Sequence, residues 1–239
     1  MELLVDPNFA PGRILSEEES AHCVKVMRHR VGDTLFVADG KGNRYECQLV
    51  DASPRGCTLN VLSTTVADEP KCHLWMAVAP TKNIDRFEWF VEKAVEIGVS
   101  RITPILCAHS ERDRVRVDRL EKLVLAAAKQ SLKCFLPSVD ELTRFADLLA
   151  SPLPPQRYIL HCGENPKPHL FSQANPATDT LILIGPEGDF SAKEIANAAA
   201  AGFQECTLGP ERLRTETAAL VATNVIAIRN QVDAIPQIS

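Results

Sequence analysis

The sequence has no excess of basic residues: 26 Lys and Arg stand against 31 Asp and Glu, a formal net charge of −5. This balance argues against a globally basic surface for nucleic acid, although it leaves room for a local basic patch. The chain also has no apolar run long enough to span a bilayer, and its first residues do not form a basic leader. We expect a soluble cytoplasmic protein without a membrane partner.

Several motifs of common enzyme classes are also missing. Neither the dinucleotide pattern GxGxxG nor the phosphate-loop pattern GxxxxGK[ST] occurs, and HExxH and GxSxG are absent as well. The eight cysteines never form a CxxC pair, which favours reduced, buried thiols over disulfides or a zinc site. We therefore expect no metal, and nucleotide-loop and hydrolase functions are disfavoured.

The chain does contain a short apolar run, residues 180–184, that ends in the turn Gly-Pro-Glu-Gly at 185–188. The run is too short for a helix and is typical of a buried strand. Ser191 and Glu194 then have the spacing of a capping box, which predicts a helix that begins there and ends at Gly202. The sequence therefore predicts a strand, a glycine turn and a helix.

A strand that ends in glycine recurs twice nearby, once with a helix after it. Residues 203–208 predict a strand followed by Gly209 and a last helix over about 215–230, and residues 160–164 end another strand in glycine. In an open parallel sheet, ligands bind beyond the carboxyl ends of the strands, where backbone amides are free. These loops thus predict a ligand site, and ordinary loop punctuation is the alternative. Charged residues near the loops are Glu187, Asp189, Glu211, Arg212, Arg214 and Glu216.

Residues 1–68 predict a small β domain with one helix. Strands are expected over 34–38, 44–50 and 57–61, separated by glycine-rich turns, so a small barrel or curled sheet is the natural closure. Ser16 and Glu19 have the spacing of a second capping box. Lys25, Arg28 and Arg30 gather at the end of that helix, where they either offset its negative end or bind a phosphate.

After a linker at 67–70, strands and helices alternate. Strands are expected over 72–79, 101–106 and 157–160, and helices over 85–97, 117–131 and 139–149. Such alternation predicts an α/β fold with a parallel sheet covered by helices. Lys82, Arg86 and Arg112 follow the first two strands, so they form a cationic rim for RNA or a set of solvated, paired arginines.

The segments 183–194 and 208–218 resemble the two signature loops of the ribosomal RNA small-subunit methyltransferase E family (RsmE), within the SPOUT class of RNA methyltransferases. The resemblance covers nearly the whole chain. It implies a PUA-like, RNA-binding β-barrel over 1–68 and a SPOUT domain over 71–239, with a parallel sheet, helices on both faces and a carboxy-terminal trefoil knot. It also implies a homodimer, S-adenosylmethionine as cofactor and methylation of N3 of a uridine in 16S ribosomal RNA, within the small ribosomal subunit.

The resemblance assigns roles to particular residues. Those expected to bind the cofactor are Leu160, His161, Gly163, Ile184, Gly185, Glu187, Gly188, Leu208, Gly209, Leu213 and Thr215. Those expected to contact RNA are Lys25, Arg28, Arg30, Lys82, Arg86 and Arg112. One departure is Asp189, which stands where the family commonly has a glycine, and a side chain there restricts a positive φ angle.

Methyl transfer to uridine N3 needs an acceptor for the N3 proton or a cation beside the resulting anion. Arg214 is the candidate for the second role and Glu187 for orienting the loop or accepting a hydrogen bond, and a structural ion pair between them is the alternative. Two other functions stay open: a non-catalytic RNA-binding or assembly module, and a SPOUT methyltransferase that acts on transfer RNA.

Overall fold

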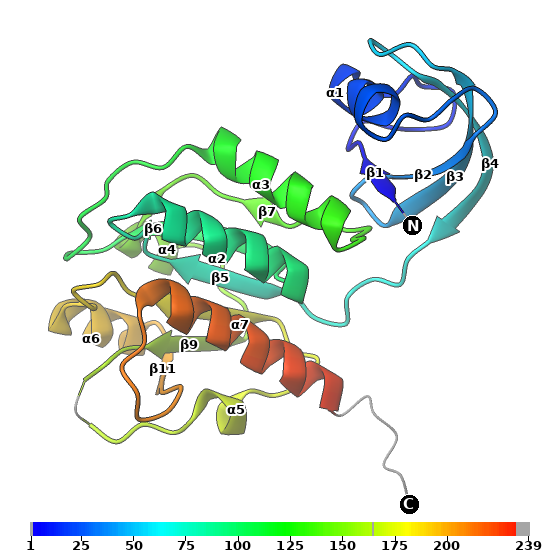
Figure 1. Cartoon of the computed structure of the whole chain (residues 1–239). Helices are drawn as coiled ribbons and strands as arrows, with labels where there is room; N and C mark the ends of the chain where they lie inside the picture. The colour runs from blue at the N-terminus through cyan, green and yellow to red at the C-terminus, as the bar shows by residue number, and fades with distance from the viewer. Residues whose placement is uncertain (1, 164, 233–239) are drawn as a thin grey trace, which may run out of the picture. The chain divides into compact units, whose positions relative to one another are not determined.

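The computed structural model describes residues 2–163 and 165–232 (Figure 1). The chain forms two compact units: the first comprises Met1–Glu69 and Leu125–Leu136, and the second comprises Pro70–Val124 and Pro137–Ser239. The first unit therefore includes a segment from the middle of the chain, which the sequence analysis assigned to the second domain. The domain limits 1–68 and 71–239 remain predictions, and residues 233–239 lie outside the described residues.

The first unit contains a four-stranded sheet. Its strands, in the order β1-β2-β3-β4, are β1 (Leu3–Val5), β2 (Thr34–Ala38), β3 (Asn43–Asp51) and β4 (Thr58–Val66). Tyr45, Cys47 and Leu49 of β3 are buried in alternation with more exposed residues, because successive side chains of a strand point to opposite faces. No ladder joins β1 to β4 among the described residues, so of the two closures expected from the sequence, a small barrel or a curled sheet, the strand pairing fits the curled sheet.

The helix of this unit begins differently from the prediction. Helix α1 (Glu17–Ala21) follows Ser16, but the Ser16 side chain makes no capping hydrogen bond, and a π-helix (His22–Val26) continues the chain. The expected capping box is therefore wrong. Its partner Glu19 is turned inward, where it is 2% exposed, accepts a hydrogen bond from the Val5 amide and pairs with Lys129.

Residues 125–136 contact the rest of the first unit through both backbone and side chains. The Leu136 amide donates to the Gly40 carbonyl at 2.9 Å, and the Gly42 amide donates to the Cys134 carbonyl at 3.0 Å. Leu125 and Leu136 also pack against a buried cluster that contains Val5. These contacts explain why the segment belongs to the first unit.

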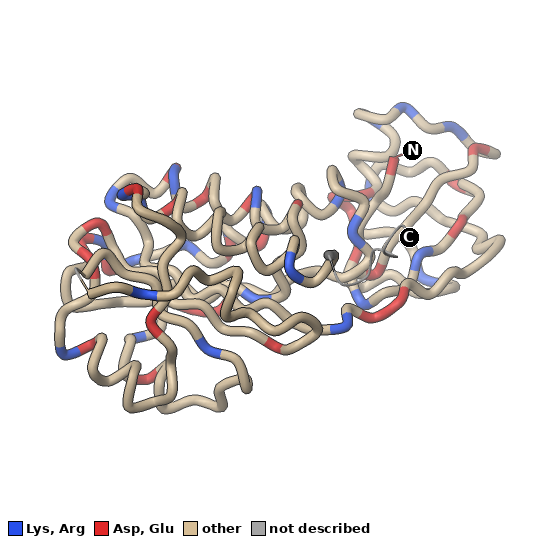
Figure 2. Tube along the Cα trace, turned by 90° about the horizontal axis from the view of Figure 1, so that it is seen from below, with Lys and Arg blue, Asp and Glu red and all other residues tan. Residues whose placement is uncertain are grey.

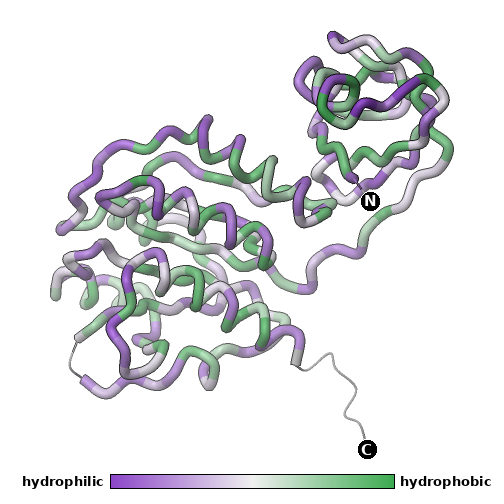
Figure 3. The backbone as a smooth tube through the Cα atoms, in the orientation of Figure 1, coloured by the Kyte–Doolittle hydropathy of each residue, from purple (hydrophilic) through white to green (hydrophobic). Residues whose placement is uncertain are grey.

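The second unit is built on a parallel sheet in the order β11-β9-β10-β5-β6-β7, with β8 paired to β6. The strands are β5 (Leu74–Val78), β6 (Arg101–Leu106), β7 (Ser138–Val139), β8 (Thr143–Arg144), β9 (Gln156–Leu160), β10 (Thr180–Ile184) and β11 (Gln204–Cys206). Every residue of β5 and β10 is buried, as expected for central strands covered on both faces, and the trace of β5 is mostly green, the hydrophobic colour, in Figure 3.

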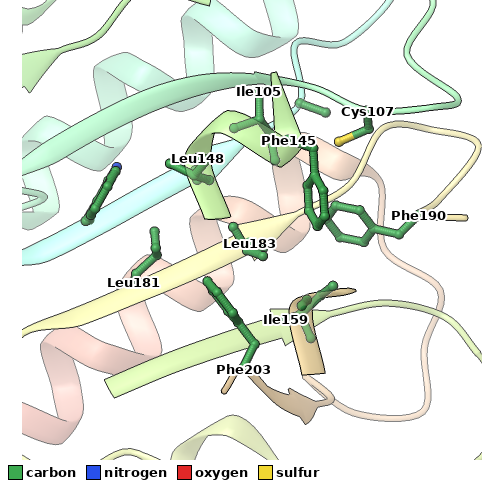
Figure 4. Close-up of a cluster of buried hydrophobic side chains, with 13 residues drawn as sticks. Ile105, Cys107, Phe145, Leu148, Ile159, Leu181, Leu183, Phe190 and Phe203 are labelled. Atoms are coloured by element: carbon green, nitrogen blue, oxygen red, sulfur yellow. The ribbon is translucent and has the colours of Figure 1, made fainter. Parts of the chain in front are cut away.

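Helices cover this sheet. They are α2 (Ile84–Ile97), α4 (Phe145–Leu149), α5 (Leu170–Gln173), α6 (Ala192–Ala200) and α7 (Thr215–Val232), whereas α3 (Val117–Gln130) begins in this unit and belongs to the first unit from Leu125 on. Helix α7 packs on α2, β5 and β10. A separate apolar cluster joins Phe145 and Phe190, whose ring centroids lie 5.5 Å apart, to Leu181 and Leu183 of β10 (Figure 4). The predicted mixed α/β fold with a parallel sheet and helices is confirmed.

One predicted helix is shorter than expected. Of residues 139–149, only Phe145–Leu149 are helical, because the sheet recruits the preceding residues. Val139 pairs with Ile102, and Thr143 pairs with Ile105. The Asp140 carboxylate also accepts a hydrogen bond from Arg101 Nε at 2.7 Å. These long-range pairings override the local helical pattern.

Candidate active site at the carboxyl edge of the sheet

The strands of the second unit end side by side. Ile184 at the end of β10 is in register with Leu160 of β9 and Val78 of β5, and Cys206 of β11 is in register with Leu160. The loops after these strands therefore meet at one edge of the sheet. This is the edge at which open parallel sheets bind ligands.

Two adjoining cavities lie among these loops. The outer cavity has a volume of about 620 Å³ and lies between the loops after β9 and β11. The inner cavity has a volume of about 330 Å³ and lies between the loops after β9 and β10 and the start of α7. Both are lined by Leu160, His161, Cys162, Arg212, Leu213 and Ala218. A ligand in the outer cavity therefore borders the inner one.

The structure brings most predicted cofactor residues to these cavities. Those that line the outer cavity are Leu160, His161, Gly163, Leu208, Gly209 and Leu213. Those that line the inner cavity are Leu160, His161, Ile184, Gly185, Glu187, Leu213 and Thr215. The inner cavity is also lined by Arg214, so the predicted catalytic arginine lies beside the predicted cofactor residues.

Gly188 is the exception, because it lines neither cavity. A Cβ added to Gly188 would lie 3.0 Å from the Cβ of His109, and the His109 Nδ1 lies 3.1 Å from the Gly188 carbonyl oxygen. A side chain here would crowd the loop after β6, so the close packing favours glycine. From the sequence, the same glycine was expected to contact the cofactor.

The loop at 185–190 is held by three neighbouring segments in addition to His109. The Glu187 carboxylate accepts a hydrogen bond from the Lys82 amide at 2.9 Å, and the Thr215 hydroxyl donates to the Gly185 carbonyl at 3.1 Å. Asp189, with φ of 63°, accepts a hydrogen bond from the Cys162 amide at 2.8 Å. The loop is therefore fixed before any ligand binds, which lowers the entropic cost of binding.

His161 is fixed on both sides of its ring. The Gly163 amide donates to Nδ1 at 3.1 Å, so Nε2 carries the hydrogen and donates to the Glu205 carboxylate at 2.7 Å. The side chain is 4% exposed. His161 therefore shapes the wall shared by the two cavities, and both of its nitrogens are occupied.

Arg214 is exposed, and no ion pair or hydrogen bond of its side chain is found among residues 2–163 and 165–232. The alternative of an Arg214–Glu187 ion pair is not observed, since Glu187 is bonded to the Lys82 amide instead. Glu216, to which the sequence analysis gave no role, is buried on the inner cavity. The sequence signal for Glu216 was its position close to Arg214, but sequence position alone does not reveal that the side chain is buried.

The residues predicted to bind RNA differ in whether their side chains are free to contact a phosphate. Lys82 pairs with Glu111 at 2.8 Å, whose hydrogen bond and charge raise the pKa of Lys82. Arg112 donates to the carbonyls of Thr81 and Lys82 at 3.1 and 2.8 Å, so it braces the loop after β5. Arg86 lies 3.9 Å from Glu216.

In the first unit, Lys25, Arg28 and Arg30 are all exposed, and Arg28 has a φ of 61°. Acidic and basic residues are interspersed along the trace of both units, as Figure 2 shows. No group of three His, Cys, Asp or Glu side chains that could hold a metal ion occurs in the described part of the chain. Within the same residues, no helix combines the length and apolar character needed to cross a bilayer.

Comparison with known proteins defines the class first. A family model described as the RNA methyltransferase domain matches residues 68–227, and one described as the RNA methyltransferase PUA domain matches residues 15–62. The protein is an RNA methyltransferase with an amino-terminal PUA domain.

The relatives define the family. The chain is 31% identical to the ribosomal RNA small subunit methyltransferase E of Mesomycoplasma hyopneumoniae, with 80% of this chain and 84% of the relative covered. It is 27% identical to the Bacillus subtilis protein of the same name, with 93% and 92% covered. The chain belongs to the ribosomal RNA small subunit methyltransferase E family.

Solved structures agree. The crystal structure of a "probable rRNA-methyltransferase" from Porphyromonas gingivalis superposes with a TM-score of 0.91 at 34% identity, over 98% of this chain and 100% of that one. The ribosomal RNA small subunit methyltransferase E of Neisseria gonorrhoeae, bound to S-adenosyl methionine, superposes with a TM-score of 0.80 at 27% identity, over 93% and 95%.

Proposed function

We propose that this protein transfers a methyl group from S-adenosylmethionine to N3 of a uridine in 16S ribosomal RNA of the small ribosomal subunit. The main support is the pair of adjoining cavities. The outer cavity is large enough for the cofactor, and the inner cavity is lined by Arg214, which is exposed and has no side-chain partner in the described structure. The cofactor is supported by the gonococcal relative, and the acceptor atom by the family resemblance.

The outer cavity suits S-adenosylmethionine in size and chemistry. Its volume of about 620 Å³ lies within the usual range for small-ligand sites, and Leu160, Leu208 and Leu213 give it apolar walls. Gly209 has a φ of 129°, a conformation that favours glycine, so the backbone there lies open beside the cavity. When bound, the cofactor supplies a methyl group activated by an adjacent sulfonium.

Two residues have proposed roles in the reaction. Arg214 stabilises the negative charge that develops on the uracil ring as N3 loses its proton, because a fixed cation is most effective where charge develops. Glu187 orients the loop at 185–190 through its hydrogen bond to the Lys82 amide. Glu187 therefore acts on position rather than on the reacting atoms.

The path of the chain supports the proposed trefoil knot. Strand β11 forms an edge of the sheet, whereas α7, which follows it, packs on β5 and β10 in the middle. Residues 207–214 must therefore cross the carboxyl edge, past the loops after β9 and β10. Such a crossing is the passage that a knot at this edge requires.

A homodimer is also proposed. Trp89 of α2 and Ile228 of α7 are 44% and 42% exposed, and the two helices pack against each other. A symmetric dimer is the commonest way to cover such apolar side chains. Light scattering should give about twice the chain mass of 26.3 kDa, and a stable, active monomer at micromolar concentration would contradict the dimer.

RNA binding is assigned to Lys25, Arg28 and Arg30, which are exposed cations suited to phosphate contacts. Because its proposed substrate is ribosomal RNA within the small subunit, the enzyme is placed in the cytoplasm.

The test is mass mapping of 16S ribosomal RNA after incubation with the protein and isotopically labelled S-adenosylmethionine. One uridine is expected to gain a labelled methyl group at N3, with no label when the cofactor is left out. Transfer to another atom, or to transfer RNA alone, would overturn the proposed substrate. No transfer to naked RNA or to assembled subunits, together with retained RNA binding, would favour a non-catalytic module.

A further inference from the structure

Glu216 is the second residue of α7, and it is buried where it lines the inner cavity. Its side chain is 9% exposed, and its Oε1 lies 3.9 Å from Arg86 Nε, which is longer than a hydrogen bond. Its Oε2 is hidden from solvent and receives no hydrogen bond within the described structure. Burying a polar atom without a partner costs free energy, so an unsatisfied carboxylate beside a ligand site needs an explanation.

The other carboxylates and the histidine that line the inner cavity are already engaged. Asp189 accepts hydrogen bonds from the amides of Cys162 and Phe190, one on each carboxylate oxygen, at 2.8 and 2.7 Å. Glu187 accepts one from the Lys82 amide. Both ring nitrogens of His161 are occupied, by the Gly163 amide and the Glu205 carboxylate.

Glu216 is therefore the carboxylate of the inner cavity whose oxygens accept no hydrogen bond within the described structure. The two oxygens of a carboxylate exchange by rotation about the last side-chain torsion, so either can be presented to the cavity. Arg86 lies close enough to attract the carboxylate and hold it at the cavity wall, although it does not occupy it with a hydrogen bond. A ligand group with an N–H donor is the complement that Glu216 lacks.

We propose that Glu216 is the catalytic base that accepts the N3 proton of the target uridine, a role that rests on the proposed function. The N3–H bond breaks, the proton passes to a Glu216 oxygen, and the electron pair remains on N3. That pair forms the new bond to the methyl carbon while the carbon–sulfur bond breaks and its electrons stay on sulfur. Glu216 then releases the proton to solvent. Arg214, on the same cavity, balances the transient negative charge of the ring.

The experiment compares Glu216→Gln with Glu121→Gln, an exposed glutamate of α3 that serves as the matched control. Single-turnover methylation is measured at saturating RNA and cofactor from about pH 6 to about pH 9. Near neutral pH, Glu216→Gln is expected to react about a hundredfold or more slowly, the usual contribution of a general base. Its cofactor affinity, measured by calorimetry, and its melting temperature should match those of the wild type.

The pH profile separates a base from a structural residue. Without Glu216, the rate depends on solvent to ionise N3, so it should rise about tenfold per pH unit and the defect should shrink. A structural defect would remain constant across pH. In Glu216→Ala, added acetate or formate should restore part of the rate, because a small carboxylate can occupy the vacated space.

RNA binding gives a readout that does not depend on turnover. Wild-type protein should bind an RNA with the target uridine more tightly than the same RNA with N3-methyluridine, which lacks the N3–H donor. This preference should fall several-fold in Glu216→Ala. A normal single-turnover rate for Glu216→Gln, or a defect that does not change with pH, would overturn the role of Glu216 as the base but would leave the proposed function in place. Wild-type protein that methylates no uridine N3 would instead overturn the proposed function, and with it this role.

Discussion

The carboxylate of Asp189 accepts a hydrogen bond from the backbone amide of Cys162 at 2.8 Å, which joins the loop after β10 to the loop after β9. Asp189 has a φ of 63°, a conformation that glycine adopts without strain and that Asp tolerates better than most residues. The departure noted in the sequence is therefore a structural link between two cavity loops. Its benefit is the fixed position of Cys162 and its neighbours.

We expect Asp189→Gly to weaken S-adenosylmethionine binding by about fivefold, because the lost hydrogen bond is worth about 1 kcal/mol. The melting temperature should change little, since glycine also relieves the positive φ. Calorimetric titration and thermal melting measure the two effects. Asp189→Asn is the control: it keeps an acceptor oxygen and should bind nearly as well as the wild type. Unchanged affinity in Asp189→Gly would show that the link does not shape the site.

Gly188→Val should lower both the melting temperature and the cofactor affinity. The effect on cofactor affinity is indirect: a Cβ at this position lies 3.0 Å from the Cβ of His109 and displaces the loop after β6. Gly188→Ala should show a smaller form of the same defect. If Gly188→Val loses affinity while its melting temperature is unchanged, Gly188 contacts the cofactor directly, as the sequence analysis expected.

Lys129→Met should destabilise the protein by about 3 kcal/mol, because it leaves the buried Glu19 carboxylate without its cation. Urea unfolding followed by circular dichroism measures the free energy of unfolding. The double variant Glu19→Gln/Lys129→Met should recover part of the loss, since no buried charge remains. Lys129→Met with wild-type stability would mean that the pair contributes nothing to the packing of residues 125–136.

Arg214→Ala should slow the single-turnover reaction on the order of a hundredfold, by analogy with the loss of one donor to a developing anion. Removing the charges of Lys25, Arg28 and Arg30 should instead weaken RNA affinity and flatten its salt dependence, with cofactor binding unchanged. The two sets of variants act as controls for each other. If Arg214→Ala reacts at the normal single-turnover rate and only binds RNA more weakly, Arg214 is a positioning contact.

Thiol labelling should single out Cys162, which is exposed and lines both cavities. Burial raises the pKa of Cys23 to about 12 and that of Cys47 to about 11, so these thiols stay protonated and unreactive near pH 8. S-adenosylmethionine should slow the labelling of Cys162 because it covers the cavity wall. Cys162→Ala should abolish the fast phase, and equal labelling rates with and without cofactor would place the cofactor elsewhere.

The local elements of the fold could be predicted because their information lies within a few residues. Ser191 and Glu194 form the predicted capping box, since both partners belong to one helical turn. The apolar run at 180–184 is the central strand β10, because a parallel strand covered on both faces needs apolar residues throughout. Most strands and helices of the second unit follow from such patterns, with β7, β8 and α5 as exceptions.

The failures share a different cause. Ser16 and Glu19 have the spacing of a capping box, yet Glu19 pairs with Lys129, which is 110 residues away. The helical pattern of residues 139–149 yields to pairing with β6 over its first part. In both cases a partner that is distant in the sequence takes the place of the local one: Lys129 binds the Glu19 carboxylate, and β6 pairs with the segment before α4.

By itself, the sequence determined the glycine loops, the alternation of strands and helices, and the residue types available for methyl transfer. Only the tertiary structure decided that Gly188 packs on His109 and that Asp189 joins two loops. It also decided that Glu216 is buried without a hydrogen-bond donor in the described structure. The physical reason is that caps, turns and periodicity act over a few neighbouring residues. The burial of a side chain, and whether its oxygens accept hydrogen bonds, depend on segments that meet only after the sheet has formed.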